Sequence, residues 1–182
     1  MPSTNKIIVA VVAVIAVVIV LAMIILPYNG LVSKDQDVQK SWSNIQVEIQ
    51  RQMDLIPSVM AQVNTSMGFE QSLLTNITQL RTQWLNTLAN GTLDDTVDLS
   101  QQFSVEMGSF LSVAENNPEI QSIQVIRDLI TELEGTQNRI AAHRIFYNDA
   151  VRDYNAAVRS FPNNLVAGMF GFEEARYYQQ GL

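Results

Sequence analysis

Residues 7–26 form an unbroken apolar run, and this run constrains the chain more than any other feature. Its twenty side chains are all Ile, Val, Leu, Ala or Met, and fifteen of them are Ile, Val or Leu. A helix of that length extends about 30 Å, which is the thickness of the hydrocarbon core of a bilayer. At about 0.4 kcal/mol for each Ile, Val or Leu, insertion gains up to about 6 kcal/mol. The run therefore predicts a transmembrane helix, with Ile7, Val14, Leu21 and Leu26 as its marker residues.

Two other interpretations of this run stay open. The first is a cleaved secretory signal, although the run is longer than a usual signal core and no Ala-x-Ala site follows it. The second is a pilin-like helix that assembles into a filament core. The short leader, residues 1–6, permits such a helix, but it has no obvious processing site before Ile7.

The flanks of the run bear on its orientation. Lys6 precedes it, and Lys34 and Lys40 follow it, so the positive charges on the two sides nearly balance. Asn-x-Ser/Thr triplets fit an exported domain and favour a bundle outside the cytoplasm. They begin at Asn64, Asn76 and Asn90.

Charge and composition exclude several function classes. The net charge is -7 with no run of basic residues, so the chain is not expected to bind nucleic acid. The chain has no Cys, and His143 is its single histidine, so we expect no disulfide, thiolate site, metal site or cofactor. A phosphate-binding loop and a Gly-x-Ser-x-Gly turn are also missing. We therefore expect a protein that is not an enzyme.

Beyond residue 30, apolar residues recur at alternating steps of three and four. This spacing is typical of amphipathic helices with a coiled-coil-like seam, and it covers residues 31–63, 69–88, 99–114 and 126–161. Short links make successive helices antiparallel. The predicted fold is all-α: an N-terminal transmembrane helix followed by an antiparallel four-helix bundle of long, short, short and long helices.

Local signals refine these helices. Pro57 lies inside the first stripe, so the Met53 carbonyl is expected to lose its helical hydrogen bond and the helix to bend or break there. A residue among 94–96 is expected to cap the third helix. Asn117 followed by Pro118 is a good start for the fourth.

The fourth helix is expected to end at Phe161, before Pro162. Because the topology brings that end towards the bilayer, we expect the apolar tail after it to pack at the base of the bundle. There it contacts either the membrane surface or a neighbouring subunit, and an intramolecular plug is the alternative. The tail residues concerned are Leu165, Met169, Phe170 and Phe172. The expected domains are an N-terminal tail (1–6), an anchor (7–27), a bundle (28–161) and a C-terminal tail (162–182).

Polar residues on the first and fourth helices predict a network across their interface. As structure, this network fixes the register of the helices; as function, it is a surface for a partner. Its members are Arg51, Asp54, Pro57, Arg144, Asn148, Asp149, Arg152 and Asn155.

Two sequence blocks carry a family resemblance. The first, residues 28–57, contains YNGLV and DLIP; the second, residues 138–172, contains NRIA, FYNDAV, FP and, at residues 168–172, GMFGF. These blocks resemble the LemA family of membrane proteins, whereas residues 70–117 match poorly, and Gln52 and Ser58 depart from the usual pattern. The resemblance implies one N-terminal span and an antiparallel helical bundle, with no catalytic residue to carry over. Members are mostly of undefined function; one branch is similar to magnetosome membrane proteins, and others are linked to membrane-protease systems.

Three functional hypotheses follow. The first is a scaffold or adaptor in the cell membrane that associates with itself or with other membrane proteins. The second is a filament subunit assembled through the apolar helix. The third is a regulatory subunit of a membrane protease.

Overall fold

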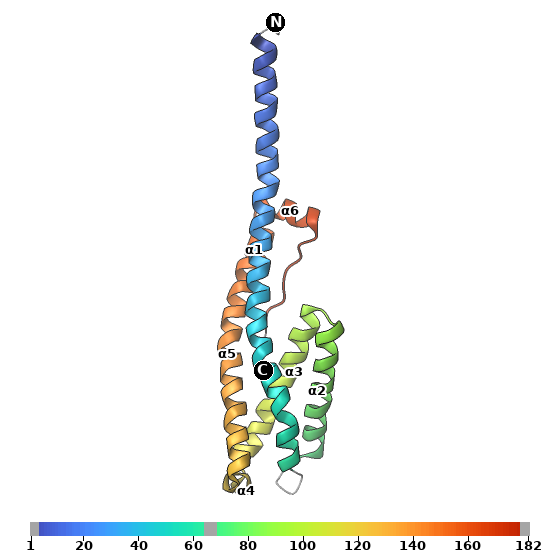
Figure 1. Cartoon of the computed structure of the whole chain (residues 1–182), viewed down its shortest axis with the longest axis vertical. Coiled ribbons are helices and arrows are strands. Elements are labelled where there is room, and N and C mark those ends of the chain that lie inside the picture. The colour runs from blue at the N-terminus through green and yellow to red at the C-terminus, as the bar shows by residue number, and fades with distance from the viewer. Residues whose placement is uncertain (1–3, 64–68, 179–182) are drawn as a thin grey trace. The chain divides into compact units, whose positions relative to one another are not determined.

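The computed structural model describes residues 4–63 and 69–178. Within these residues all regular secondary structure is helical, and six helices follow one another in the chain (Figure 1). They are α1 (Thr4–Gln62), α2 (Gln71–Asn90), α3 (Leu93–Glu115), α4 (Pro118–Ser122), α5 (Gln124–Arg159) and α6 (Asn163–Phe170). The long, short, short, long order of α1, α2, α3 and α5 confirms the predicted fold class.

The chain divides into two compact units. The anchor unit contains Met1–Gln39 and Ala150–Ala175, and the bundle unit contains Lys40–Asp149 and Arg176–Leu182. Both α1 and α5 contribute residues to each unit. The predicted boundary after residue 27 thus lies inside α1, because α1 continues through Pro27 as one helix. A single proline removes one helical hydrogen bond and leaves the turns on either side intact.

In the bundle unit, side-chain bonds join α1 to α5 in antiparallel order. Arg139 Nε donates to Glu48 Oε2 at 2.8 Å, and Gln52 Nε2 donates to the Leu133 carbonyl at 3.3 Å. Residue numbers therefore rise along α1 as they fall along α5. The α1 stripe faces the core as predicted, with Trp42, Ile45, Ile49, Ile56 and Val59 all buried.

The α2 and α3 helices complete this bundle as an antiparallel hairpin. The rings of Phe69, just before α2, and Phe110 stack with centroids 4.7 Å apart, and Asn76 Nδ2 donates to Glu106 Oε1 at 3.1 Å. Trp84 is fully buried, and its indole Nε1 donates to Gln50 Oε1 on α1 at 3.4 Å. The bundle core is therefore shared by all four of its longer helices.

Pro57 lies inside α1, where the structure shows how the helix tolerates it. Pro57 has no amide hydrogen, so it cannot donate to the Met53 carbonyl four residues earlier. That carbonyl instead accepts a hydrogen bond from Arg81 Nε at 3.0 Å. The predicted loss of a helical bond is therefore compensated from α2, and α1 runs on to Gln62. A side chain from a neighbouring helix has replaced the missing backbone donor.

Two helix boundaries differ from the predictions. The third helix is capped by Thr92 rather than by a residue among 94–96, because Thr92 and Asp95 form a reciprocal capping box. The fourth helix is divided: Asn117 and Pro118 start α4 as predicted, but extended backbone at Ile123 separates α4 from α5.

The anchor unit has a small core of its own. Leu31 of α1, Ala157 of α5, and Val166 and Ala167 of α6 form a buried cluster, with Phe172 packed against it. The Phe161–Pro162 peptide bond, which links α5 to α6, is cis. Gly171 ends α6 with a φ of 75°, a left-handed conformation that glycine adopts at little cost.

Candidate functional site

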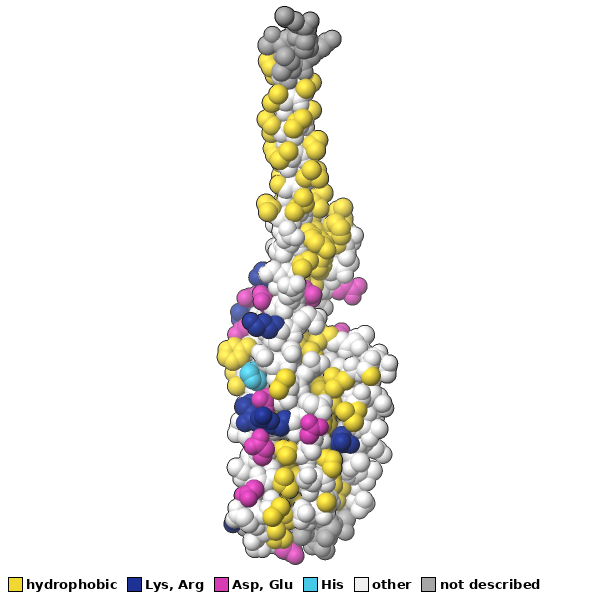
Figure 2. All heavy atoms as spheres, viewed as in Figure 1, with side chains coloured by type: hydrophobic (Ala, Val, Ile, Leu, Met, Phe, Trp, Pro, Cys, Tyr) yellow, Lys and Arg dark blue, Asp and Glu magenta, His cyan; other side chains and the backbone are white. Residues whose placement is uncertain are grey.

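Apolar side chains in the first part of α1 are mostly exposed, and Figure 2 shows them along the face in view. Val14 is 63% exposed, Leu21 50% and Leu26 70%; Ile7 lies in the same helix. Among the described residues, α1 is the one helix long and apolar enough to cross a membrane. Water solvates such a surface poorly, whereas hydrocarbon solvates it well and the helix satisfies its own backbone hydrogen bonds. This arrangement suits a membrane span.

The apolar tail lies against the end of this run within the anchor unit. The ring of Tyr28 contacts Phe170 and Phe172, with centroids 4.9 and 5.7 Å apart and both pairs edge-on. Leu165 and Met169 point away from the small core and are 59% and 69% exposed. The helix α6 therefore has one buried face and one exposed apolar face.

In the anchor unit, Asn155 binds the backbone of the segment that follows α6. Its amide nitrogen donates to the Ala175 carbonyl at 2.9 Å, and its amide oxygen accepts from the Ala175 amide at 2.8 Å. Asn155 is 5% exposed. An asparagine side chain carries both an acceptor and donors, so it can bond the amide and the carbonyl of one backbone residue together.

In the bundle unit, Asn148 makes the same pair of bonds with Tyr178. The donor bond to the Tyr178 carbonyl is 2.9 Å and the acceptor bond from its amide is 2.8 Å. Tyr147, the residue before Asn148 on α5, donates from its hydroxyl to the Arg176 carbonyl at 2.8 Å. Asn148 and Asn155 were predicted as members of an inter-helix or partner surface; in the structure, both bind the chain's own C-terminal segment.

Tyr178 makes a buried contact that sequence reasoning missed. Its ring is buried, 6.3 Å from the ring of Trp42, and its hydroxyl shares a hydrogen bond of 3.1 Å with Ser104. The only signal in the sequence is the aromatic pair Tyr177–Tyr178 after the apolar tail, which has no helical periodicity. Burial, with a smaller contribution from Asp94, raises the pKa of the Tyr147 phenol far above its ordinary value.

The charged members of the predicted network are distributed differently. Arg51 lies 3.8 Å from Glu132 of α5, an exposed ion pair between helices, whereas Asp54 accepts a bond from Gln50 within α1 at 2.9 Å. Pro57 is exposed. The shortest charged contact between α1 and α5 joins Arg139 to Glu48, a pair that the predicted network did not include.

The remaining predicted residues lie on α5. Arg144 is half-buried and Asp149 is exposed; Arg152, in the anchor unit, is exposed and pairs with the adjacent Asp153 at 3.2 Å. Between Arg144 and Asp149, Ile145 and Phe146 are 61% and 63% exposed. Two large apolar side chains in succession therefore face outwards, flanked by charged residues.

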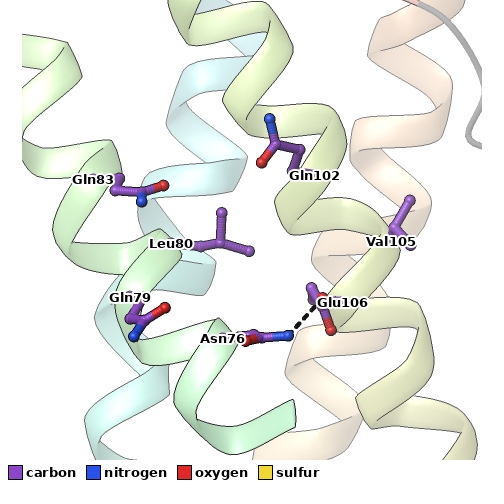
Figure 3. Close-up of a pocket in the computed structure, with 7 residues that line it drawn as sticks. All are labelled: Asn76, Gln79, Leu80, Gln83, Gln102, Val105 and Glu106. Atoms are coloured by element: carbon purple, nitrogen blue, oxygen red, sulfur yellow. Dashed lines mark hydrogen bonds between the residues drawn. The ribbon is translucent and has the colours of Figure 1, made fainter. Parts of the chain in front are cut away.

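A polar groove lies between α2 and α3 (Figure 3). Its volume is about 420 Å³, and four of its lining side chains are amides. A hydrogen bond from Asn76 to Glu106 joins the two helices across the groove. No nucleophile or paired acid and base lines it. The full lining is Asn76, Gln79, Leu80, Gln83, Gln102, Val105 and Glu106.

The structure describes two of the three Asn-x-Ser/Thr triplets. Asn76 is bonded to Glu106, Asn90 donates to the Asn86 carbonyl at 3.4 Å near the end of α2, and Asn64 lies outside the described residues. Over residues 4–63 and 69–178, no group of three metal-ligating side chains lies together.

These features define an all-α protein with a helical bundle and one N-terminal helix able to span a bilayer. The chain belongs to the LemA family: the family model matches residues 41–181. The chain is 26% identical over 193 aligned residues to magnetosome proteins MamQ 1 and MamQ 2 of Paramagnetospirillum magneticum, covering 93% of this chain and 71% of each relative. It is 21% identical over 183 residues to magnetosome protein MamQ of Magnetospirillum gryphiswaldense, covering 88% of this chain and 67% of that protein.

The family membership agrees with the resemblance carried by the sequence blocks. Together with the apolar part of α1, it identifies a membrane-associated protein. Neither the family description nor the names of these relatives denotes an enzyme.

Proposed function

We propose that this protein is a membrane-anchored, non-enzymatic scaffold that holds a second membrane protein, or another copy of itself, beside the bilayer. One observation carries the proposal: α1 begins as an exposed apolar span and continues as a core helix of the bundle unit. The helix that carries the apolar span therefore also supplies a core helix of the bundle unit. A single span over residues 7–27, with the bundle outside the cytoplasm, completes the proposal.

The partner is proposed to dock on the exposed pair Ile145 and Phe146 of α5. These side chains are 61% and 63% exposed, and burying both against a partner gains about 3–5 kcal/mol before the costs of association. A central aromatic side chain ringed by polar groups is a common pattern at interface hot spots. Arg144 and Asp149 supply charged groups of both signs next to the pair.

The test replaces Phe146 with the photoreactive benzoylphenylalanine in the full-length protein in its native membrane. Val125 is the matched control, because it lies on the same helix and is 58% exposed. We expect a defined cross-linked product from position 146, identified by mass spectrometry, and little from position 125. Equal yields at the two positions would refute docking on this pair.

A second measurement tests the scaffold role itself. Mild-detergent purification of the tagged chain is expected to retain a partner or a second copy, and Phe146→Glu is expected to release it while Val125→Glu does not. Recovery of the chain alone and monomeric would contradict the scaffold. A co-purified membrane protease would make this chain the regulatory subunit of that enzyme.

The filament alternative is tested separately by N-terminal sequencing of the mature protein. An intact leader through Lys6 supports the scaffold, whereas cleavage between Lys6 and Ile7 supports a pilin-like subunit.

The orientation of the bundle is tested by labelling a single introduced cysteine, which is possible because the chain has no native Cys. A Gln102→Cys variant is expected to react with a membrane-impermeant maleimide in intact cells if the bundle is outside the cytoplasm.

A further inference from the structure

We propose that α6 is a second membrane contact, which inserts its exposed face into the interfacial layer of the same bilayer that the start of α1 spans. This proposal rests on the anchor of the proposed function and adds a lipid-binding element that the scaffold role does not require. The inserted side chains are Phe161, Leu165, Met169 and Phe170.

The first argument is the two-faced character of α6. Val166 and Ala167 are each 3% exposed and pack on Leu31 and Ala157, so they hold the helix on the small core of the anchor unit. The other side of the helix is exposed: Leu165 is 59% exposed and Met169 69%, and Phe161 just before the helix is 79% exposed. Phe170 packs against Tyr28 and is still 53% exposed. An intramolecular plug would bury these side chains, so the exposure argues against that alternative.

The second argument is the absence of charge. Residues 160–172 contain no Asp, Glu, Lys or Arg, although charged residues stand immediately outside, at Arg159 and Glu173. A charged side chain in the apolar layer is costly. An exposed helix face without charges therefore suits the membrane–water interface, unlike the charged outer face of most surface helices. The pairing of Arg159 with Glu174 lies outside this stretch of residues.

The third argument is the level of α6 along α1. Phe170 and Phe172 pack on Tyr28, which comes two residues after Leu26, the last residue of the apolar run. At the helical rise this is about 3 Å past the hydrocarbon edge, and Leu31 is about 7 Å past it. The interfacial layer on each side of a bilayer is roughly 5–8 Å thick. The residues that contact α6 thus lie at the depth where aromatic side chains concentrate in membrane proteins.

The surface of the anchor unit agrees with this level. In Figure 2, hydrophobic side chains continue from the apolar part of α1 onto the region of α6, and charged side chains begin below them. On α1, after the apolar run, the first charged residue is Lys34, about 12 Å past Leu26. The apolar surface of α6 is therefore continuous with the span, which identifies lipid rather than a separate partner as its occupant.

The test measures the depth of single labels in the full-length protein. Because the chain has no Cys, Met169→Cys can be labelled alone with an environment-sensitive nitrobenzoxadiazole dye. The protein is reconstituted into phosphatidylcholine–phosphatidylglycerol vesicles that contain nitroxide lipids with the quencher at a shallow or at a deep acyl carbon. Val14→Cys reports the span, and Gln102→Cys on α3 reports water.

We expect at least threefold stronger quenching at position 169 than at position 102, with the shallow quencher more effective than a deep one. At position 14 the deep quencher should be the more effective. If position 169 behaves like position 102 while position 14 is quenched, α6 does not touch lipid and the anchor stands. If position 14 is not quenched either, the anchor itself fails.

Two further measurements keep the proposal falsifiable. Leu165→Cys, on the same face, is expected to repeat the result in case the substitution at Met169 disturbs folding. Measurement at several protein-to-lipid ratios distinguishes contact with lipid from contact with a second copy. A dye at position 169 that is shielded only at high protein-to-lipid ratio and escapes the lipid quenchers would mean that another copy covers α6, which would overturn the proposal.

Discussion

The bond between Asn155 and Ala175 allows a quantitative test of how the C-terminal segment is held. Asn155→Ala removes both hydrogen bonds, of 2.9 and 2.8 Å, from a side chain that is 5% exposed. Each bond is worth about 1 kcal/mol net, so the substitution should lower the free energy of opening the segment by about 2 kcal/mol. This corresponds to about 30-fold faster hydrogen exchange at the Ala175 amide.

The assay is native-state amide hydrogen exchange of the full chain in detergent micelles, under conditions where exchange tracks the opening equilibrium. The amide of Phe103, in the middle of α3, reports global unfolding and should change much less. Asn76→Ala is the matched control, because it removes one exposed bond from α2 to Glu106 and should leave Ala175 unchanged. If the Ala175 amide exchanges equally fast in wild type and Asn155→Ala, then Asn155 does not hold the segment.

Three further substitutions test the bundle unit. Tyr147→Phe removes the bond to Arg176 and should cost about 1 kcal/mol at neutral pH in urea unfolding. Because burial raises the pKa of the Tyr147 phenol, its contribution is fully present below the ordinary tyrosine value near 10 and is lost as pH rises above it. Wild type should therefore lose more stability than Tyr147→Phe between about pH 9 and 11, and parallel curves would contradict this. Thr92→Ala breaks the capping box with Asp95 and should lower the free energy of unfolding by about 1 kcal/mol. An unchanged Tm would contradict this. Gly108→Ala adds a methyl group into open space on α3 and should raise stability by about 0.5–1 kcal/mol; a lower urea midpoint would refute this.

Periodicity in the sequence was sufficient for the bundle because burial follows the helical repeat. The stripe on α1 from Trp42 to Val59 and that on α3 from Leu99 to Ala114 are buried as predicted. The pattern overreached at Phe161, which continues the α5 spacing but is 79% exposed, because α5 ends at Arg159. A repeat in the sequence cannot tell where the helix that carries it ends.

Contacts with backbone atoms were beyond sequence reasoning. Asn148 and Asn155 were predicted as members of an inter-helix or partner surface, and nothing in their spacing shows that both pair with the main chain of residues 175–178. The partner atoms are a carbonyl and an amide that every residue carries, so they leave no signature in the sequence. The cap of the third helix was missed for a related reason, since several neighbouring side chains had the chemistry to accept the bond.

The sequence by itself determined which solvent each part of the chain requires. Twenty apolar residues without a polar side chain need hydrocarbon, and four amphipathic stripes need one another, because the free energy of both depends on composition and spacing. Only the tertiary structure decided how the exceptions are satisfied: Arg81 supplies the donor that Pro57 withholds from Met53, and α6 turns one face to Leu31 and the other outwards. These outcomes depend on which groups meet in space, and that is a property of the packed helices rather than of any one segment.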